Sequence, residues 1–393
     1  MRQVKQKYVS KTASQLKPSG IRKFFDLASQ MDNVISLGVG EPDFVTPWNV
    51  CEAGYASLES GYTAYTANAG LMELREEISS YLSEQFSLSY SAQSEIVLTV
   101  GASQAIDLAF RAIIDPGDEV IIVEPGFVAY APAVTLAGGV PVSLETSAED
   151  EFKVTRDRLK KVITKRTKAI LFCFPSNPTG ATMSEEELKD ITDLIEKHDL
   201  LVLSDEIYAE LTYDQTHYSI SRIEGMRERT ILISGFSKAF AMTGWRLGYV
   251  TGPEEIIGAI LKIHQYTMMC APTIAQHGAL EALRSGRADL DRMKRSYRQR
   301  RNYLVKAFNQ MGLSCHMPGG AFYAFPSIQS TGMTSDEFAE KLLQEERVAV
   351  VPGHVFGAGG EGYIRCSYAT SIESLQEAVK RIEQFVERHA EKA

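Results

Sequence analysis

The chain has 393 residues, enough for two ordinary domains, and 44% of them are hydrophobic while 23% are charged, which is typical of a folded protein with a large core. Acidic residues outnumber basic ones by 50 to 41, and the net charge of −9 argues against a nucleic acid or an anionic membrane as the partner. The apolar runs are far shorter than the roughly 20 residues that span a bilayer, and the basic N-terminal segment lacks the apolar stretch of a secretory signal.

Strand-like apolar runs alternate with helical patterns through the middle of the chain. A helical pattern begins near Met72, another covers 105–114, and a third runs from the capping box Ser184-Glu-Glu-Glu187 to about His198. We expect strands over 96–100, 119–123, 168–174, 200–203, 230–233 and 247–250. This alternation predicts an α/β layer with a mostly parallel sheet.

The last third of the chain has a different pattern. Helical patterns cover about 287–311, a strand-like run covers 363–369, and a helix from Ser371 carries one apolar stripe, formed by Ile372, Leu375, Val379, Ile382 and Val386. We therefore predict a large domain over 49–286 and a smaller α+β domain over 287–393. The segment 1–48 has no core of its own and is expected to be an arm that joins the small domain.

Cysteines and histidines show no metal-binding or disulfide pattern. No CxxC pair or HExxH motif occurs, and the five cysteines are widely spread, at Cys51, Cys173, Cys270, Cys315 and Cys366. We expect reduced thiols, a cytoplasmic protein and no bound metal.

Four polar residues follow predicted strands, namely Ser103, Asn177, Asp205 and Lys238. The carboxyl ends of parallel strands form the edge at which ligands bind in an open α/β sheet. We therefore expect these four side chains to lie around one site.

Asp205 and Lys238 each allow two interpretations. A buried carboxylate at the end of an apolar run needs a cationic partner, so Asp205 is either a helix cap or the counter-charge of a protonated heterocycle nitrogen. Lys238 is either a solvated loop lysine or a desolvated amine with a lowered pKa that can form a Schiff base.

An anion site is expected between the first predicted strand and its helix. Free backbone N–H groups of Gly101, Ala102 and Ser103 would favour an anion there, although a plain turn explains the glycine equally well. Arg246 offers a second phosphate contact, and Asn177 could be a turn residue only.

The segment GFSKAFAMTGWRLG (235–248) resembles the lysine-attachment signature of the class I/II pyridoxal-phosphate-dependent aminotransferases, which have the aspartate-aminotransferase-like fold type I. Six further motifs resemble that family in order and spacing, namely GEPDF (40–44), YTANAG (65–70), GASQA (101–105), SNPTG (176–180), SDEIY (204–208) and YIRCSYA (363–369). The resemblance covers essentially the whole chain. It implies a large domain with a mostly parallel seven-stranded sheet flanked by helices, and a smaller α+β domain formed by both chain ends.

The resemblance also implies the role of each matching residue. Lys238 would carry pyridoxal 5′-phosphate as a Schiff base and move the substrate proton, while Asp205 would pair with the pyridine nitrogen. Further contacts with the cofactor would come from Tyr208 and Asn177 at its phenolic oxygen, Phe127 on its ring, and Gly101, Ala102, Ser103, Ser237 and Arg246 at its phosphate.

The resemblance implies an L-amino acid and a 2-oxo acid as substrates, with 2-oxoglutarate as the expected acceptor, that react in ping-pong order. Arg365 would bind the substrate carboxylate beside Gly40 and Asn177. Tyr65 would reach the phosphate of a neighbouring subunit, which implies a homodimer with shared active sites.

The sequence departs from the family pattern at three points. Phe127 stands where the aspartate-type branch has tryptophan, so that branch does not predict the substrate. Gly235 replaces a phosphate-binding serine, which leaves Ser234 or Ser237, and we favour Ser237. No motif supplies a second arginine for an acidic side chain, and Arg22 is a weak candidate.

Three alternatives to an aminotransferase differ from it in cofactor, in reaction or in having no enzymatic activity. The run 357–362 matches GxGxxG, but a strand-like run follows it instead of a helix, so we interpret it as a loop and reject a nicotinamide dehydrogenase. A carbon–sulfur β-lyase on the same fold stays open as an alternative. A DNA-binding regulator is disfavoured by the net negative charge.

Overall fold

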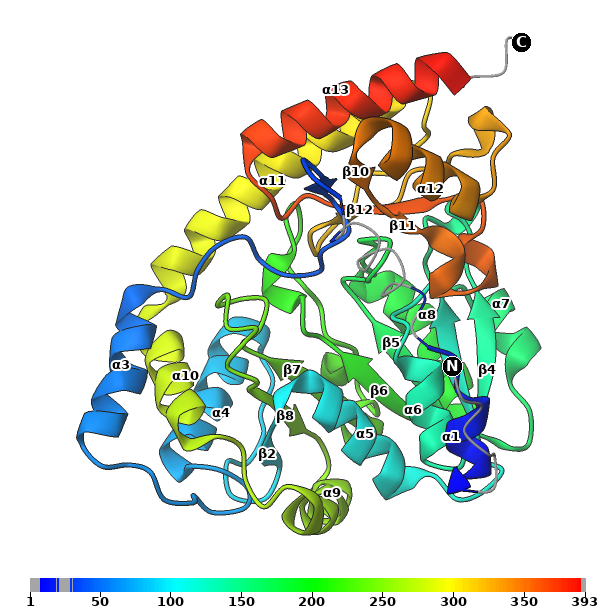
Figure 1. Ribbon diagram of the computed structural model, residues 1–393. Coiled ribbons are helices and arrows are strands. Elements are labelled where there is room, and N and C mark those ends of the chain that lie inside the picture. The colour runs from blue at the N-terminus through cyan, green and yellow to red at the C-terminus, as the bar shows by residue number, and fades with distance from the viewer. Residues whose placement is uncertain (1–7, 19, 21–28, 30, 390–393) are drawn as a thin grey trace.

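The computed structural model describes residues 8–18, 20, 29 and 31–389. Its centre is a seven-stranded sheet in the order β2-β8-β7-β6-β5-β3-β4 (Figure 1). The strands are β2 (Ile96–Thr99), β3 (Glu119–Glu124), β4 (Val140–Glu145), β5 (Thr167–Cys173), β6 (Leu201–Asp205), β7 (Thr230–Gly235) and β8 (Gly248–Thr251). Only β8 runs antiparallel to its neighbours, which confirms the predicted mostly parallel sheet.

Helices cover both faces of this sheet because neighbouring strand residues point to opposite faces. Val120, Ile122 and Leu203 pack into one core cluster, whereas Ile121 and Val202 pack into another. The first face is covered by α5 (Gly101–Ile113), α6 (Tyr130–Leu136) and α9 (Glu254–Thr267), and the second by α7 (Arg156–Val162) and α8 (Glu185–Lys197). The predicted capping box at the start of α8 is present, with both of its hydrogen bonds.

A third group of helices lies beside the β2–β8 end of the sheet. It consists of α3 (Trp48–Glu59), α4 (Met72–Phe86) and α10 (Thr273–Ser285), and α10 contacts both of the others. The short helix α1 (Lys11–Gln15) lies against α6.

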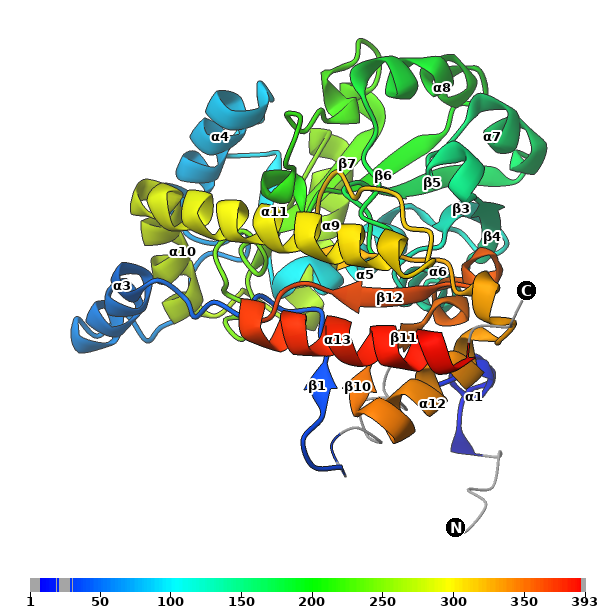
Figure 2. The same ribbon diagram turned by 90° about the horizontal axis from the view of Figure 1, so that it is seen from above.

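The small domain is built around a three-stranded antiparallel sheet in the order β11-β12-β9. Its strands are β9 (Tyr323–Ala324), β11 (Val351–Pro352) and β12 (Ile364–Ser367), and its helices are α11 (Arg287–Gln310), α12 (Ser335–Glu346) and α13 (Ile372–His389). Figure 2 shows α11 and α13 side by side. Of the predicted α13 stripe, Ile372 is the exception, since it is 37% exposed at the first turn while the other members are buried.

Part of the N-terminal arm, residues 35–37, is paired with this domain. Strand β1 (Ile35–Ser36) lies parallel to β10 (Val348–Ala349), and the Ser367 N–H donates to the carbonyl of Leu37. This pairing supports the predicted division at 48 and 286, which itself stays a prediction. No helix in the described ranges is long and apolar enough to span a membrane.

Candidate active site

The predicted residues come together at the carboxyl ends of the central strands, where the small domain meets the sheet. Asp205 is the last residue of β6, while Asn177 and Lys238 lie in the loops that follow β5 and β7. The small domain contributes Arg365 from β12, and the segment after β1 contributes Gly40. Three hydrogen bonds described below join these parts across the domain boundary.

Asp205 lies at the end of its strand with 4% of its surface exposed. The Tyr130 hydroxyl donates to its Oδ2 at 2.7 Å, and the Ile207 N–H donates to its Oδ1 at 3.2 Å. Burial raises the pKa of this carboxyl to about 6, although both hydrogen bonds act to lower it. The helical turn that follows has Tyr208 as its N-cap, so the helix-cap interpretation of Asp205 is wrong. Its carboxylate is left without a cationic hydrogen-bond partner in the described part of the chain.

Lys238 donates from Nζ to the carbonyl of Gly40 at 2.7 Å. Burial lowers the pKa of this amine to about 8, Glu41 opposes that shift, and the charges of Arg365 and Arg246 add to it. The amine is therefore substantially neutral in mildly alkaline solution. A lysine in this state can act as a nucleophile or a base, as the second interpretation of Lys238 requires.

Arg365 is a buried guanidinium with hydrogen-bond donors to spare. Its Nη1 donates to Asn177 Oδ1 at 2.8 Å and its Nη2 to the carbonyl of Gly38 at 2.7 Å, while its Nε has no partner in the described structure. The rings of Tyr323 and Phe356 lie 4.5 and 4.9 Å from the guanidinium carbon. Among the described residues no carboxylate forms an ion pair with it. A buried, unpaired guanidinium with free donors is suited to a carboxylate ligand.

The predicted anion site lies at the N-terminus of α5, which begins at Gly101, four residues earlier than the sequence pattern indicates. Ala102 and Ser103 are thus in the first turn, where backbone N–H groups have no acceptor within the helix. Gly101 has φ +73°, and a Cβ atom there would lie 2.6 Å from Nη2 of Arg246. The guanidinium therefore lies directly against the helix terminus, and the positive φ of Gly101 is a backbone conformation that favours glycine.

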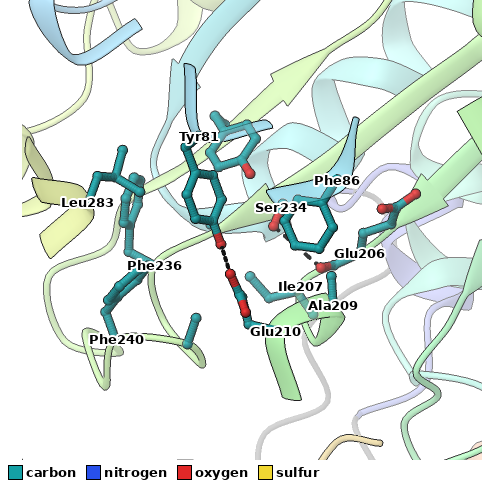
Figure 3. Close-up of a pocket in the computed structure, with 13 residues that line it drawn as sticks. Tyr81, Phe86, Glu206, Ile207, Ala209, Glu210, Ser234, Phe236, Phe240 and Leu283 are labelled. Atoms are coloured by element: carbon teal, nitrogen blue, oxygen red, sulfur yellow. Dashed lines mark hydrogen bonds between the residues drawn. The ribbon is translucent and has the colours of Figure 1, made fainter. Parts of the chain in front are cut away.

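The two candidate serines differ in their surroundings. The Ser234 hydroxyl donates to the carbonyl of Glu206 at 3.4 Å and lines a small cavity of about 20 Å³ that also contains Tyr81 and Glu210 (Figure 3). This cavity holds none of the predicted cofactor ligands. Ser237 lies beyond the end of β7, next to Lys238, and its side chain is buried. The geometry favours Ser237 as the phosphate ligand.

Two tyrosines of the site were not predicted. Tyr130 binds the Asp205 carboxylate and forms an edge-to-face pair with Phe127, whose ring centroid lies 5.5 Å away. Tyr323 lies with its hydroxyl 2.9 Å from that of Tyr208. Tyr130 belongs to the same PGFVAY segment as Phe127, but nothing in the sequence indicates that it reaches a residue 75 positions away.

One predicted residue is not part of this cluster. Tyr65 is 80% exposed, so it does not pack on its own domain as an ordinary loop aromatic residue would. Arg22 lies outside the described residues. No group of three or more His, Cys, Asp or Glu residues that could hold a metal ion occurs in the part of the chain that the structure describes.

The sequence profile described as aminotransferase class I and II matches residues 32–382. The chain belongs to this aminotransferase family. A Bacillus subtilis (strain 168) protein named "Putative aminotransferase YugH" is 63% identical over 381 residues, covering 97% of this chain and 99% of that protein. The aspartate aminotransferase of Pyrococcus abyssi is 48% identical over 372 residues, covering 94% and 96%. The solved aromatic aminotransferase from Pyrococcus horikoshii OT3 is 46% identical, covers 94% of this chain and 99% of that one, and superposes with a TM-score of 0.89.

These matches confirm the family, the fold and the enzyme class that the motifs predict. The rejection of a dehydrogenase also agrees with the structure. Within the GxGxxG match, Ala358–Gly360 form a 3₁₀ turn that follows the turn Gly353–Phe356, and the chain then leads into β12, not into a helix. This aminotransferase therefore has no dinucleotide-binding turn at 357–362.

Proposed function

We propose that this aminotransferase uses pyridoxal 5′-phosphate to move an amino group from an L-amino acid to a 2-oxo acid, with 2-oxoglutarate as the acceptor and ping-pong kinetics. The observation that carries the proposal is the juxtaposition of three groups. They are a partly buried amine with a pKa of about 8 at Lys238, a buried carboxyl without a cationic hydrogen-bond partner at Asp205, and a buried, unpaired guanidinium at Arg365.

The donor set fits this cofactor. A phosphate would be held by the first turn of α5, at Gly101, Ala102 and Ser103, by the Ser237 hydroxyl and by Arg246. Phe127, which packs on Tyr130, would contact the ring face, and Tyr208 and the amide N–H₂ of Asn177 would donate to the phenolic oxygen. When bound, the cofactor supplies an electron sink for negative charge at the substrate α-carbon.

The two titratable residues then have complementary tasks. Lys238 would bind the cofactor as a Schiff base, and its freed amine would carry the proton at the α-carbon, a task for which its lowered pKa is suited. Asp205 would face the protonated ring nitrogen. That cation would offset the burial cost that raises the pKa of Asp205, so the carboxyl would be ionised in the loaded enzyme.

Arg365 determines where the substrate lies. Asn177 and the Gly38 carbonyl take two of its five N–H donors, so a pair remains for the two oxygens of an α-carboxylate. Relatives of 48% and 46% identity bear the names of aspartate and aromatic aminotransferases, so both acidic and aromatic donors belong in the test.

A donor and acceptor panel tests this function. Purified protein is expected to be yellow with bound cofactor, to lose that band on borohydride reduction with the label on Lys238, and to form a new amino acid only when a 2-oxo acid is present. Release of pyruvate from a cysteine conjugate without any acceptor would instead identify the β-lyase alternative. Colourless protein that cannot bind the cofactor would contradict both.

We also propose a homodimer with shared active sites. Large exposed hydrophobic side chains gather on α3, on the loop 61–70 and at the end of α9, namely Trp48, Tyr55, Leu58, Tyr62, Tyr65, Tyr266, Met268 and Met269. These three segments are joined to one another and to α10, since Asn68 donates to the Met269 carbonyl and the Tyr62 ring stacks on His277. Exposed apolar side chains on neighbouring segments are typical of a subunit interface.

A mixing experiment tests the shared site. Excess inactive Lys238→Ala chains are combined with impaired Tyr65→Phe chains under subunit exchange. Because a heterodimer would hold one site with both an intact Lys238 and an intact Tyr65, activity should exceed that of either parent. No gain despite proven exchange, or full activity of a monomer, would contradict the dimer.

A cytoplasmic location is part of the same proposal. It is supported by the five cysteines, none of which forms a disulfide in the structure.

A further inference from the structure

Tyr323 lies where three parts of the chain meet. It is buried on strand β9 of the small domain, and its hydroxyl lies 2.9 Å from the hydroxyl of Tyr208, which follows β6 of the large domain. A Cβ atom built on Gly40 would lie 2.8 Å from the same hydroxyl and 3.8 Å from the ring carbon that bears it, with no other atom of a neighbour within 4 Å. Tyr323 therefore contacts the expected cofactor ligand Tyr208 and the backbone on which Lys238 rests.

The two hydroxyls have only two protons to share. Burial raises the pKa of both phenols, so both keep their protons near neutral pH. In the proposed function Tyr208 uses its single proton to donate to the phenolic oxygen of the cofactor. It must then accept from Tyr323, whose hydroxyl has Tyr208 as its one hydrogen-bond partner in the described ranges. A donor that itself accepts a hydrogen bond donates more strongly.

The ring of Tyr323 has a second contact. Its centroid lies 4.5 Å from the guanidinium carbon of Arg365, and the ring of Phe356 lies 4.9 Å from that carbon. Stacking of a guanidinium on aromatic rings fixes its plane without using its N–H donors. The donors of Arg365 that Asn177 and Gly38 do not take therefore stay available for a ligand.

We propose that Tyr323 is a positioning residue with two separable parts: its hydroxyl directs the Tyr208 proton toward the cofactor, and its ring holds Arg365 in the plane that receives the substrate carboxylate. This inference rests on the proposed function. In it, Tyr323 neither contacts the substrate nor transfers a proton.

Removal of the hydroxyl alone tests the first part. In the loaded enzyme, hydrogen bonds donated to the phenolic oxygen lower the pH midpoint of the visible band. Tyr323→Phe is expected to raise this midpoint by about 0.5 pH unit, less than the effect of one whole hydrogen bond. The matched control is Tyr368→Phe, which removes a buried small-domain hydroxyl that contacts the Ala321 carbonyl instead of the site. It should leave the midpoint unchanged.

Removal of the ring tests the second part. The KM for amino acids is expected to be about tenfold higher in Tyr323→Leu than in Tyr323→Phe. For amines without a carboxylate, the two variants should have the same KM. An equal change for both substrate classes would contradict a role in holding Arg365.

A third measurement needs no cofactor. In the apoenzyme, Gly40→Ala forces a Cβ against the Tyr323 hydroxyl, so it should lower the melting temperature by several degrees. The same substitution in a Tyr323→Phe background leaves an ordinary contact at 3.8 Å and should cost clearly less. In a Tyr368→Phe background the full loss should remain.

The outcomes separate the two proposals. A wild-type protein that binds no cofactor would overturn the proposed function and this inference together. A yellow, active wild type whose band titrates alike in Tyr323→Phe and Tyr368→Phe would overturn the inference alone. Equal costs of Gly40→Ala in all backgrounds would contradict the contact of the Tyr323 hydroxyl with Gly40, and with it the placement of that hydroxyl beside Tyr208.

Discussion

The two walls of the active site are built from different kinds of side chain. The large-domain wall presents the buried Asp205 and the partly buried Lys238, whose pKa values are shifted toward neutrality, to about 6 and about 8. The small-domain wall presents Arg365 and Tyr323, which keep one protonation state and are fixed by stacking. The first wall is suited to proton and electron movement, and the second to holding a carboxylate in one place. Substitutions on the two walls should therefore change different kinetic quantities.

The largest effect is expected on the large-domain wall, from Lys238→Ala. Both the covalent attachment of the cofactor and the acid–base group are lost, so multiple-turnover transamination should fall by at least about 10⁴. Steady-state assays and a single-turnover assay measure this loss. Cofactor retained by the other contacts should still be detectable after gel filtration. Near-normal turnover would show that Lys238 is not the catalytic amine.

Asp205→Asn should reduce kcat by about 10²–10³ while the fold is kept, because an amide cannot stabilise a protonated ring nitrogen. Steady-state kinetics with saturating cofactor measure it. Activity within about twofold of wild type would mean that the carboxylate serves only its structural contacts with Tyr130 and Ile207.

The same variant should stabilise the apoenzyme, although it lowers the activity of the loaded enzyme. Burial raises the pKa of Asp205 to about 6, so ionisation of this carboxyl lowers the stability of the folded apoenzyme. This loss of stability is complete above pH 6 and absent below the pKa of about 4 that the carboxyl has in the unfolded chain. Asp205→Asn should raise the apoenzyme melting temperature by a few degrees at pH 7.5, and this gain should shrink as the pH falls from 6 to 4. Glu206→Gln is the matched control, since Ser204, Ser219 and His217 already satisfy that carboxylate, and it should give no gain.

On the small-domain wall, Arg365→Lys is expected to raise the KM for amino acids about 10- to 100-fold and to spare the cofactor content. A lysine keeps the charge but loses the planar pair of donors. Steady-state kinetics with amino acids and with amines that lack the carboxylate measure the difference. If both substrate classes suffered equally, the carboxylate role of Arg365 would be wrong.

The smallest effect is expected from Ser237→Ala, which should weaken cofactor binding about threefold to tenfold because one hydroxyl contact to the phosphate is lost. Equilibrium titration of the apoenzyme with the cofactor measures it. Ser234→Ala is the control, since Ser234 faces the separate cavity beside Glu206 and Tyr81. A larger effect at Ser234 would reverse the assignment of the two serines.

Sequence patterns predict the large-domain wall better than the small-domain wall. Strand ends and the loops after them follow from apolar runs, so Asp205 and Lys238 could be placed at one edge before their surroundings were known. Tyr323 could not be placed in this way, because its partner Tyr208 is 115 positions away and β9 has only two residues, too few for a periodic pattern. The start of α5 was also predicted four residues late, because its first turn contains a glycine, which is a poor helix former.

The extended segment after β1 makes one mechanical connection between the two walls. The Gly38 carbonyl accepts from Arg365 and the Gly40 carbonyl accepts from Lys238, two residues apart on one stretch of backbone. That stretch is anchored by Leu37, whose N–H and carbonyl bind Ala349 and Ser367 of the small domain. A rotation of the small domain against the sheet would therefore carry both carbonyls with it. Such a rotation would change the distance from the Gly40 carbonyl to Lys238, while Arg365 keeps the Gly38 carbonyl as its acceptor. The position of the small domain and the availability of the lysine amine would therefore be linked through a few backbone atoms.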